Sequence, residues 1–194
     1  KPRSDEKAGG NIESRFGDGA QTTRRSVDVL IGPDDDARQL ILAALARTAE
    51  RAQSFAAIID EAQFLSHTHI DQLRQLVDED NVSVWAYGLR TDFQKNLFEG
   101  SERLFALADS AIDLSTISPE LAICEGFAAE PCERKAIFNT RLVDDEYVFT
   151  GAQKAIDQEH ADAPQTVGKT TYRALCSPCY RVAESASHHP TGEE

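Results

Sequence analysis

The sequence predicts an α/β protein built on a parallel sheet, followed by a small second domain that carries cysteines. Short apolar runs alternate with longer amphipathic segments through the middle of the chain, which is the pattern of strands joined by helical crossovers. One apolar run ends in two adjacent carboxylates, and two pairs of cysteines follow in the C-terminal half. With 194 residues, 41% of them hydrophobic, the chain is long enough for one sizeable core and a small appendage.

The charge balance argues against two classes of partner. The chain has 33 Asp and Glu against 20 Lys and Arg, so it lacks the basic surface that holds a nucleic-acid backbone. No apolar run approaches the roughly 20 residues that span a bilayer. We expect a cytoplasmic protein with neither a nucleic acid nor a membrane as partner. Because the sequence contains no Met, we also expect further sequence upstream of Lys1.

Local signals predict the elements of the α/β core. Asp34, Asp35 and Asp36 supply capping carboxylates before an apolar face at helical spacing, and Ser66 does the same for a second helix. The remaining expected elements are strands at 55–60, 82–87 and 111–114 and a helix around 97–108. We expect the strand at 55–60 to be buried on both faces, and the polar ends, 1–11 and 183–194, to be mobile.

The paired carboxylates Asp60 and Glu61 are the first chemical signal. At the end of a buried strand, Asp60 could hold Mg²⁺ through water, and Glu61 could accept a proton from a hydroxyl nucleophile as a general base. The alternative reading is a solvated acidic turn without catalytic function.

Longer motifs follow these carboxylates in order. They read Asp60-Glu61-Ala62-Gln63-Phe64, then Tyr87-Gly88-Leu89-Arg90-Thr91-Asp92-Phe93, then Leu97-Phe98-Glu99-Gly100-Ser101. The chain thereby resembles the type II thymidine kinases, the family with a zinc-bearing lasso domain. The resemblance implies a P-loop-kinase-like core whose first strand and phosphate loop are absent from this chain.

The resemblance also implies roles for individual residues. Glu61 matches the catalytic base, and Asp60 matches the acid associated with magnesium. The group around ATP and Mg²⁺ is Asp60, Glu61, Ala62, Gln63 and Arg15. The nucleoside-binding group is Phe64, Leu89, Phe93, Phe98 and Tyr172. The alternative for the apolar members is that they simply fill the core. Near the start, Glu13 stands where the family has Asp.

Four cysteines form two pairs, Cys124 with Cys132 and Cys176 with Cys179. The second pair is a Cys-x-x-Cys knuckle suited to tetrahedral zinc, and we expect all four thiols to hold one structural Zn²⁺. The first pair departs from the family because seven residues intervene. Three cysteines with another ligand, a disulfide, or no metal remain the alternatives.

Between the cysteine pairs, residues 149–156 resemble the strand that enters the lasso loop, and 157–165 look like added polar sequence. Gly168-Lys169-Thr170-Thr171 resembles the end of a phosphate-binding loop, but no apolar strand precedes it and Cys176 follows too soon for a full helix. We therefore reject it as a phosphate site.

The expected organisation is a nucleotide-binding core at 1–115, a zinc and lasso domain at 116–182 and a flexible tail at 183–194. The expected function is phosphoryl transfer from ATP to the 5′-hydroxyl of thymidine, and the resemblance implies a homotetramer. The alternative is a kinase-fold protein that has lost ATP binding and serves as a binding or structural subunit.

Overall fold

A computed structural model describes residues 1–3, 11–14, 23–47, 56–116, 123–127, 132–153 and 168–188. It divides the chain into two compact units. The first comprises Lys1–Arg90 and Phe98–Ser110, and the second comprises Thr91–Leu97 and Ala111–Glu194. Both α-helices and β-strands occur, and one strand pair is parallel, as the sequence predicts.

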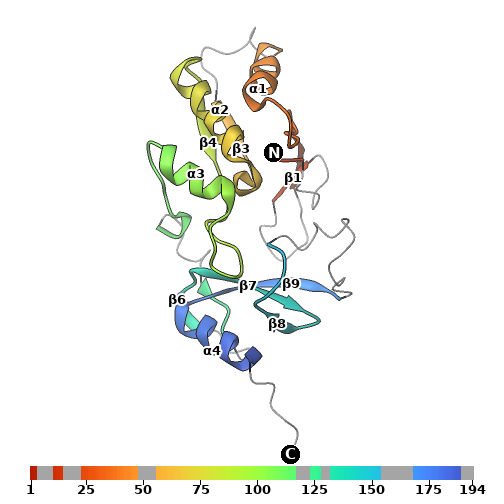
Figure 1. Ribbon diagram of the computed structural model, residues 1–194, viewed down its shortest axis with the longest axis vertical. Coiled ribbons are helices and arrows are strands. Elements are labelled where there is room, and N and C mark those ends of the chain that lie inside the picture. Colours follow the sequence, from red (N-terminus) through yellow and green to blue (C-terminus); the bar gives the residue numbers. More distant parts are fainter. Residues whose placement is uncertain are drawn as a thin grey trace, which may run out of the picture. The chain divides into compact units, whose positions relative to one another are not determined.

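The first unit contains one β-α-β crossover (Figure 1). The strands β3 (Ala56–Ile59) and β4 (Ser83–Ala86) pair in parallel, and α2 (His67–Asp78) connects them after the short 3-10 helix η2 (Ala62–Phe64). The other elements of this unit are α1 (Ala37–Ala46), α3 (Glu99–Leu107) and the antiparallel pair of β1 (Asn11–Ser14) and β2 (Thr23–Ser26).

Both predicted helix caps are confirmed. The Asp36 carboxylate accepts a hydrogen bond from the Gln39 amide, 2.9 Å, at the start of α1. At the start of α2, the Ser66 hydroxyl accepts from the His69 amide, and the His69 ring accepts in return from the Ser66 amide. Each cap satisfies an amide that has no partner within its own helix.

The prediction that β3 is buried on both faces is wrong. Ala57 and Ile59 join the core, but Ile58 on the opposite face is 66% exposed, and its cross-strand neighbour Trp85 is 56% exposed. An apolar run shows that a strand is apolar on both faces but does not show whether a second layer covers the outer one.

Two further expectations for local structure also fail. The start of the chain was predicted to be mobile, but main-chain hydrogen bonds hold Lys1–Arg3 in place. The Arg3 amide donates to the Ile31 carbonyl at 2.7 Å, and the Ile31 amide donates to the Lys1 carbonyl at 2.9 Å. The segment 111–114 forms no strand and instead leads into the 3-10 helix η3 (Leu114–Thr116). Ile112 and Leu114 are both more than half exposed, and no described strand offers this segment a ladder to join.

The second unit is built on an antiparallel sheet in the order β8-β7-β9. Its strands are β7 (Phe138–Val143), β8 (Glu146–Val148) and β9 (Thr170–Leu175). The described part of this unit also contains η3, a second antiparallel pair, β5 (Ile123–Cys124) with β6 (Cys132–Lys135), and α4 (Ser177–His188).

The strand expected at 149–156 lies earlier in the sequence. Asp144 and Asp145 both have positive φ, 51° and 66°, which suits a tight two-residue hairpin turn, so the returning strand begins at Glu146. It ends at Val148, and residues 154–156 lie outside the described part. The helix α4 also extends into the segment predicted as a flexible tail, since it runs to His188 with Ala183 fully buried.

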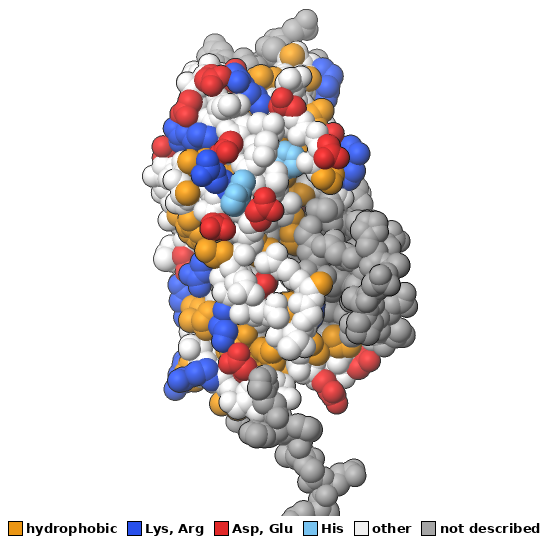
Figure 2. Space-filling model, viewed as in Figure 1, with side chains coloured by type: hydrophobic (Ala, Val, Ile, Leu, Met, Phe, Trp, Pro, Cys, Tyr) orange, Lys and Arg blue, Asp and Glu red, His pale blue; other side chains and the backbone are white. Residues whose placement is uncertain are grey.

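The visible surface mixes charges of both signs, as Figure 2 shows. Several described acidic residues pair with arginine. Arg38, for example, bonds Asp80 at 2.7 Å, and Arg74 contacts Asp78 and Asp109. Within the described ranges, every helix is too short or too polar to cross a membrane.

Candidate functional site

The two adjacent carboxylates of the first unit, Asp60 and Glu61, lie where β3 ends. Asp60 forms a bend directly after Ile59, and Glu61 follows with φ 54° and ψ 38°, a left-handed conformation that is uncommon for a residue with a side chain. Such a conformation persists where the surroundings fix it, and it often marks a functional position. The backbone at Glu61 therefore needs support from neighbouring elements.

Gln63 supplies part of this support through its side-chain amide. Its Nε2 donates to Glu61 Oε2 at 2.6 Å, and its Oε1 accepts from the Leu89 amide at 3.2 Å. The side chain is only 2% exposed. Because the amide is bonded at both ends, it fixes the orientation of the Glu61 carboxylate relative to the segment that follows β4.

Two glycines let neighbouring segments come close to this turn. A Cβ at Gly88 would lie 2.3 Å from Gln63 Oε1, and a Cβ at Gly100 would lie 2.4 Å from the Ala62 carbonyl oxygen and 2.7 Å from that of Leu65. The Ala62 amide also donates to the Tyr87 carbonyl at 2.8 Å. The turn at 61–65 is thus held between the end of β4 and the start of α3.

Asp60, Phe64, Leu89 and Phe98 are the other first-unit residues of the predicted site that the structure describes. The Asp60 carboxylate is half-buried and makes no hydrogen bond or ion pair to any residue that the structure describes. Phe64 and Phe98 pack edge to face, with ring centroids 5.6 Å apart. Leu89 is 46% exposed, whereas Phe98 is 5% exposed. Arg15 lies outside the described residues.

Phe93 belongs to the second unit and is buried there. Its ring is 2% exposed, and the Arg141 guanidinium carbon lies 3.8 Å from the ring centroid. Arg141 covers the ring, so in this structure Phe93 packs against a cation and offers no open face for stacking. Tyr172, on β9, is 42% exposed, and burial raises its pKa, partly offset by the charge of Arg141.

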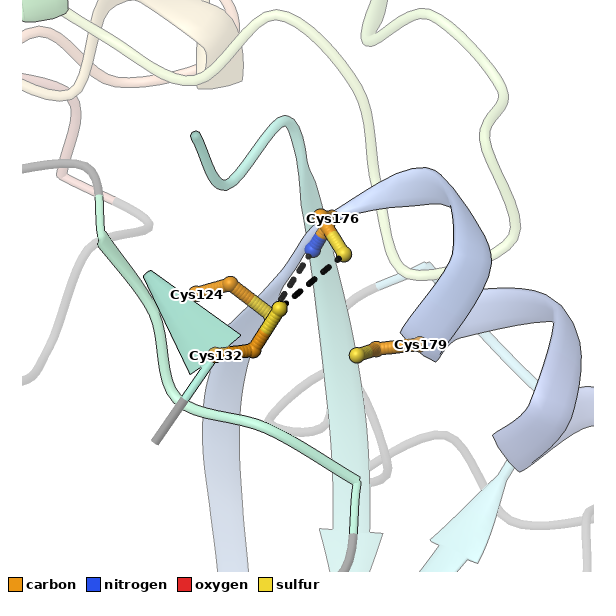
Figure 3. A group of neighbouring side chains, drawn as sticks. All are labelled: Cys124, Cys132, Cys176 and Cys179. Carbon is orange, nitrogen blue, oxygen red and sulfur yellow. Dashed lines mark hydrogen bonds between the residues drawn. The ribbon is translucent and has the colours of Figure 1, made fainter. Parts of the chain in front are cut away.

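The four cysteines of the second unit converge (Figure 3). Cys124 and Cys132 face each other across the β5-β6 pair, so their long sequence separation does not keep them apart. Cys176 lies between β9 and α4, and Cys179 lies in the first turn of α4. All four sulfur atoms lie within 4.8 Å of one another.

The spacing of the thiols fits a metal site. The Cys132 and Cys176 sulfurs are 3.8 Å apart, and all four thiols are free. A disulfide requires about 2.0 Å. Sulfur ligands about 2.3 Å from a tetrahedral zinc ion would lie about 3.8 Å from each other. The four cysteines can therefore hold a metal ion without rearrangement of their backbone.

Main-chain amides and neighbouring thiols surround the sulfur atoms of the cluster. The Cys176 and Gly126 amides both donate to the Cys124 sulfur, at 3.1 Å and 3.4 Å. Burial raises the pKa of the Cys176 thiol, but hydrogen bonds from Cys179 and the other thiols outweigh it and bring that pKa to about 7. Burial and the neighbouring thiols raise the pKa of Cys179 to about 12. A bound cation would favour the ionised form of both groups.

The segment Gly168-Lys169-Thr170-Thr171 is no phosphate-binding loop. Thr170 begins β9, and the Lys169 amide donates to the Asp144 carboxylate at 2.9 Å. A phosphate loop would follow a strand and open a helix, which is the reverse of this order.

Sequence reasoning missed two buried residues of the second unit. Arg141 donates to the carbonyls of Thr150 and Ala152, at 2.7 Å and 2.9 Å, and Tyr180 donates from its hydroxyl to the Phe93 carbonyl at 2.6 Å. Tyr180 stands directly after the Cys-x-x-Cys knuckle, which is a signal for a buried position. Arg141 has no such signal, because an arginine in a strand usually faces solvent.

The structure thus combines an α/β unit, in which two carboxylates follow a parallel strand, with a smaller β-rich unit that contains a four-cysteine cluster. The thymidine kinase family model matches residues 10–180. A thymidine kinase of Rhodopirellula baltica is 34% identical over 169 residues, which cover 85% of this chain and 68% of that protein. A thymidine kinase of Pasteurella multocida is 35% identical over 174 residues, which cover 88% of this chain and 77% of that protein.

A shorter match to the thymidine kinase of Encephalitozoon cuniculi is 55% identical over 60 residues, covering 31% of this chain and 28% of that protein. The chain belongs to the thymidine kinase family. The resemblance drawn from the sequence motifs is confirmed.

Proposed function

We propose that this chain acts as a kinase that transfers the γ-phosphoryl group of ATP to the 5′-hydroxyl of thymidine, a reaction of nucleotide salvage. The observation that carries the proposal is the left-handed Glu61, held by Gln63 at the carboxyl end of a parallel strand in a chain of this family. Substrates of open α/β sheets bind outside the carboxyl ends of the strands.

In this proposal, Glu61 acts as the general base. Its carboxylate accepts the proton of the 5′-hydroxyl as that oxygen attacks the γ-phosphorus in line with the leaving ADP oxygen. Gln63 keeps the carboxylate oriented, since its amide is bonded to both Glu61 and Leu89. Gly88 and Gly100 pack closely against the turn at residues 61–65, and this packing keeps the geometry in place before the substrate arrives.

Asp60 is the proposed magnesium-associated acid. Its carboxylate is half-buried and bonds no described residue, so its oxygens are available to accept hydrogen bonds from metal-bound water. Mg²⁺ bound with ATP would neutralise phosphate charge. The ATP and magnesium group that we propose contains Asp60, Glu61, Ala62, Gln63 and Arg15.

The proposal includes the architecture that the family implies. The first unit corresponds to a P-loop-kinase-like nucleotide core and the second to a zinc and lasso domain, with Zn²⁺ held by the four cysteines. The thymidine-binding group is Phe64, Leu89, Phe93, Phe98 and Tyr172. The assembly expected for such a kinase is a homotetramer in the cytoplasm.

A transfer assay on full-length protein tests the function. With ATP and Mg²⁺, we expect thymidine to be converted to thymidine monophosphate with one ADP formed per product. Deoxycytidine and deoxyadenosine serve as parallel substrates and should react far more slowly. A folded full-length protein that phosphorylates no nucleoside would instead favour a binding or structural subunit.

A further inference from the structure

The segment Thr91–Leu97 packs with the second unit although the residues that flank it, Arg90 and Phe98, belong to the first. Within the second unit, side chains from several elements hold it. Gln94 Nε2 donates to the Phe149 carbonyl at 3.1 Å, and Gln153 Nε2 donates to the Asp92 carboxylate at 3.1 Å.

The hydroxyl of Tyr180 makes the shortest of these contacts. It donates to the main-chain carbonyl of Phe93 at 2.6 Å, and the residue is only 1% exposed. Its ring packs against Phe138 and Phe149, with centroids 5.1 Å away in both cases. Because Tyr180 follows Cys179 in the first turn of α4, the hydrogen bond connects the cysteine cluster to the segment that carries Phe93.

Arg141 fixes the ring of Phe93, while Tyr180 fixes its main chain. The guanidinium lies over the ring and also donates to the carbonyls of Thr150 and Ala152. The Arg141 side chain is only 7% exposed, and Gly151 leaves space for it, since a Cβ there would lie 2.8 Å from its Nη2. Phe93 is therefore held at two points.

We propose that Tyr180 is a positioning residue for the nucleoside: its hydroxyl fixes the Phe93 main chain and thereby the segment Thr91–Leu97. The inference rests on the proposed function, in which Phe93 of this segment belongs to the thymidine-binding group. The hydroxyl does not touch the substrate and acts through the Phe93 carbonyl. Its loss should weaken nucleoside binding without a matching effect on ATP.

A matched control lies in the same group of aromatic residues. Tyr147 stacks on Phe127 and Phe149, and its hydroxyl is buried without a hydrogen-bond partner among the described residues. Tyr180→Phe and Tyr147→Phe thus remove the same atom from similar surroundings. Only Tyr180→Phe removes a hydrogen bond. Both variants keep the ring, so packing is conserved, including the contact of Lys95 with the Tyr180 ring.

Two measurements on full-length protein test the inference. Hydrogen exchange of peptides covering Asp92 to Leu97 reports on the segment itself, whose Gln94 and Asn96 amides both donate to the Asp92 carboxylate. We expect faster exchange there in Tyr180→Phe and wild-type exchange in Tyr147→Phe. Steady-state kinetics should show the KM for thymidine raised by about threefold to tenfold, the usual cost of one hydrogen bond, with the KM for ATP unchanged.

Each outcome decides a separate point. Unchanged exchange in Tyr180→Phe, or equal effects of the two variants, would overturn the positioning role. Faster exchange with an unchanged thymidine KM would show that the segment does not serve the nucleoside, which also overturns the inference. If wild-type protein phosphorylates no nucleoside, the proposed function has failed, and the inference fails with it even where exchange shows that Tyr180 holds the segment.

Discussion

Glu61 is the residue at which local backbone strain and the proposed chemistry coincide. Its left-handed backbone costs about 1–3 kcal/mol for a residue with a side chain, and this cost is offset by contacts from both sides of the turn. The tightest contacts come at Gly88 and Gly100, where an added Cβ would press on Gln63 Oε1 and on the Ala62 carbonyl oxygen respectively. The candidate base is therefore supported by glycines that carry no chemistry themselves.

Alanine at these glycines gives the first prediction. Gly100→Ala should lower the free energy of unfolding by about 1–3 kcal/mol, because its Cβ would press on the carbonyl oxygens of Ala62, Gln63 and Leu65. Gly88→Ala should cost less, because its closest contact is the Gln63 amide, a side-chain end that can move. Urea denaturation measures both, with the exposed Glu102→Ala on the same helix as control. Equal stability of Gly100→Ala and wild type would contradict the tight approach.

At the residue scale, the sequence motifs predicted which residues gather around the turn but not how they are held. Asp60, Glu61 and Gln63 stand together in one motif, so their proximity follows from the sequence. The left-handed conformation at Glu61 does not, because nothing in the residue type demands it. Phe93 was predicted to bind the nucleoside, but its motif could not indicate that Arg141, 48 residues further along the chain, covers its ring.

At the scale of single elements, helix starts could be predicted best. Ser66 and Asp36 act within four residues of their own position, so local sequence is sufficient to identify them. Strand burial depends on distant segments, and the expectations for residues 58 and 111–114 failed for this reason. The hairpin turn at Asp144 and Asp145 was missed because two aspartates carry a weaker turn signal than Asn-Gly or Asp-Gly.

The second prediction concerns the Ser66 cap of α2. Ser66→Ala removes the acceptor for the His69 amide and should reduce the free energy of unfolding by about 1 kcal/mol. Chemical denaturation followed by circular dichroism measures the change. The exposed Ser110→Ala, outside any helix or strand, should behave like wild type. A Ser66 variant as stable as this control would show that the capping box contributes nothing.

The cysteine cluster gives the third prediction, at the scale of the whole molecule. We expect purified protein to contain one zinc ion per chain by elemental analysis, and Cys132→Ser to lose most of it. Loss of the ion leaves four converging thiols without the cation that stabilises their ionised form, so the melting temperature should fall. Ser177→Ala, which lies between the second pair of ligands, is the matched control.

The alternatives to zinc have distinct signatures in the same experiment. A disulfide would leave fewer than four reactive thiols when denatured protein is titrated in the presence of a chelator. A cluster without metal would show no zinc in wild-type protein and the same melting temperature with and without chelator. Either result would contradict the proposed site.

The two units of the molecule contain different parts of the proposed chemistry. The proposed base, the proposed magnesium-associated acid and three apolar nucleoside candidates belong to the first unit, whereas Phe93, Tyr172 and the cysteine cluster belong to the second. Family membership is shown by matches across residues 10–180, and the activity proposed for the chain depends on Glu61.

The rate of phosphoryl transfer in Glu61→Gln tests that central claim most directly. Glutamine keeps the size and the hydrogen bonding of the side chain but cannot act as the base, so we expect kcat for thymidine to fall by about 10²–10⁴-fold in full-length protein. Glu102→Gln, an exposed carboxylate of the first unit, should keep the wild-type kcat. A folded Glu61→Gln variant with a kcat close to wild type would show that the proton is accepted elsewhere.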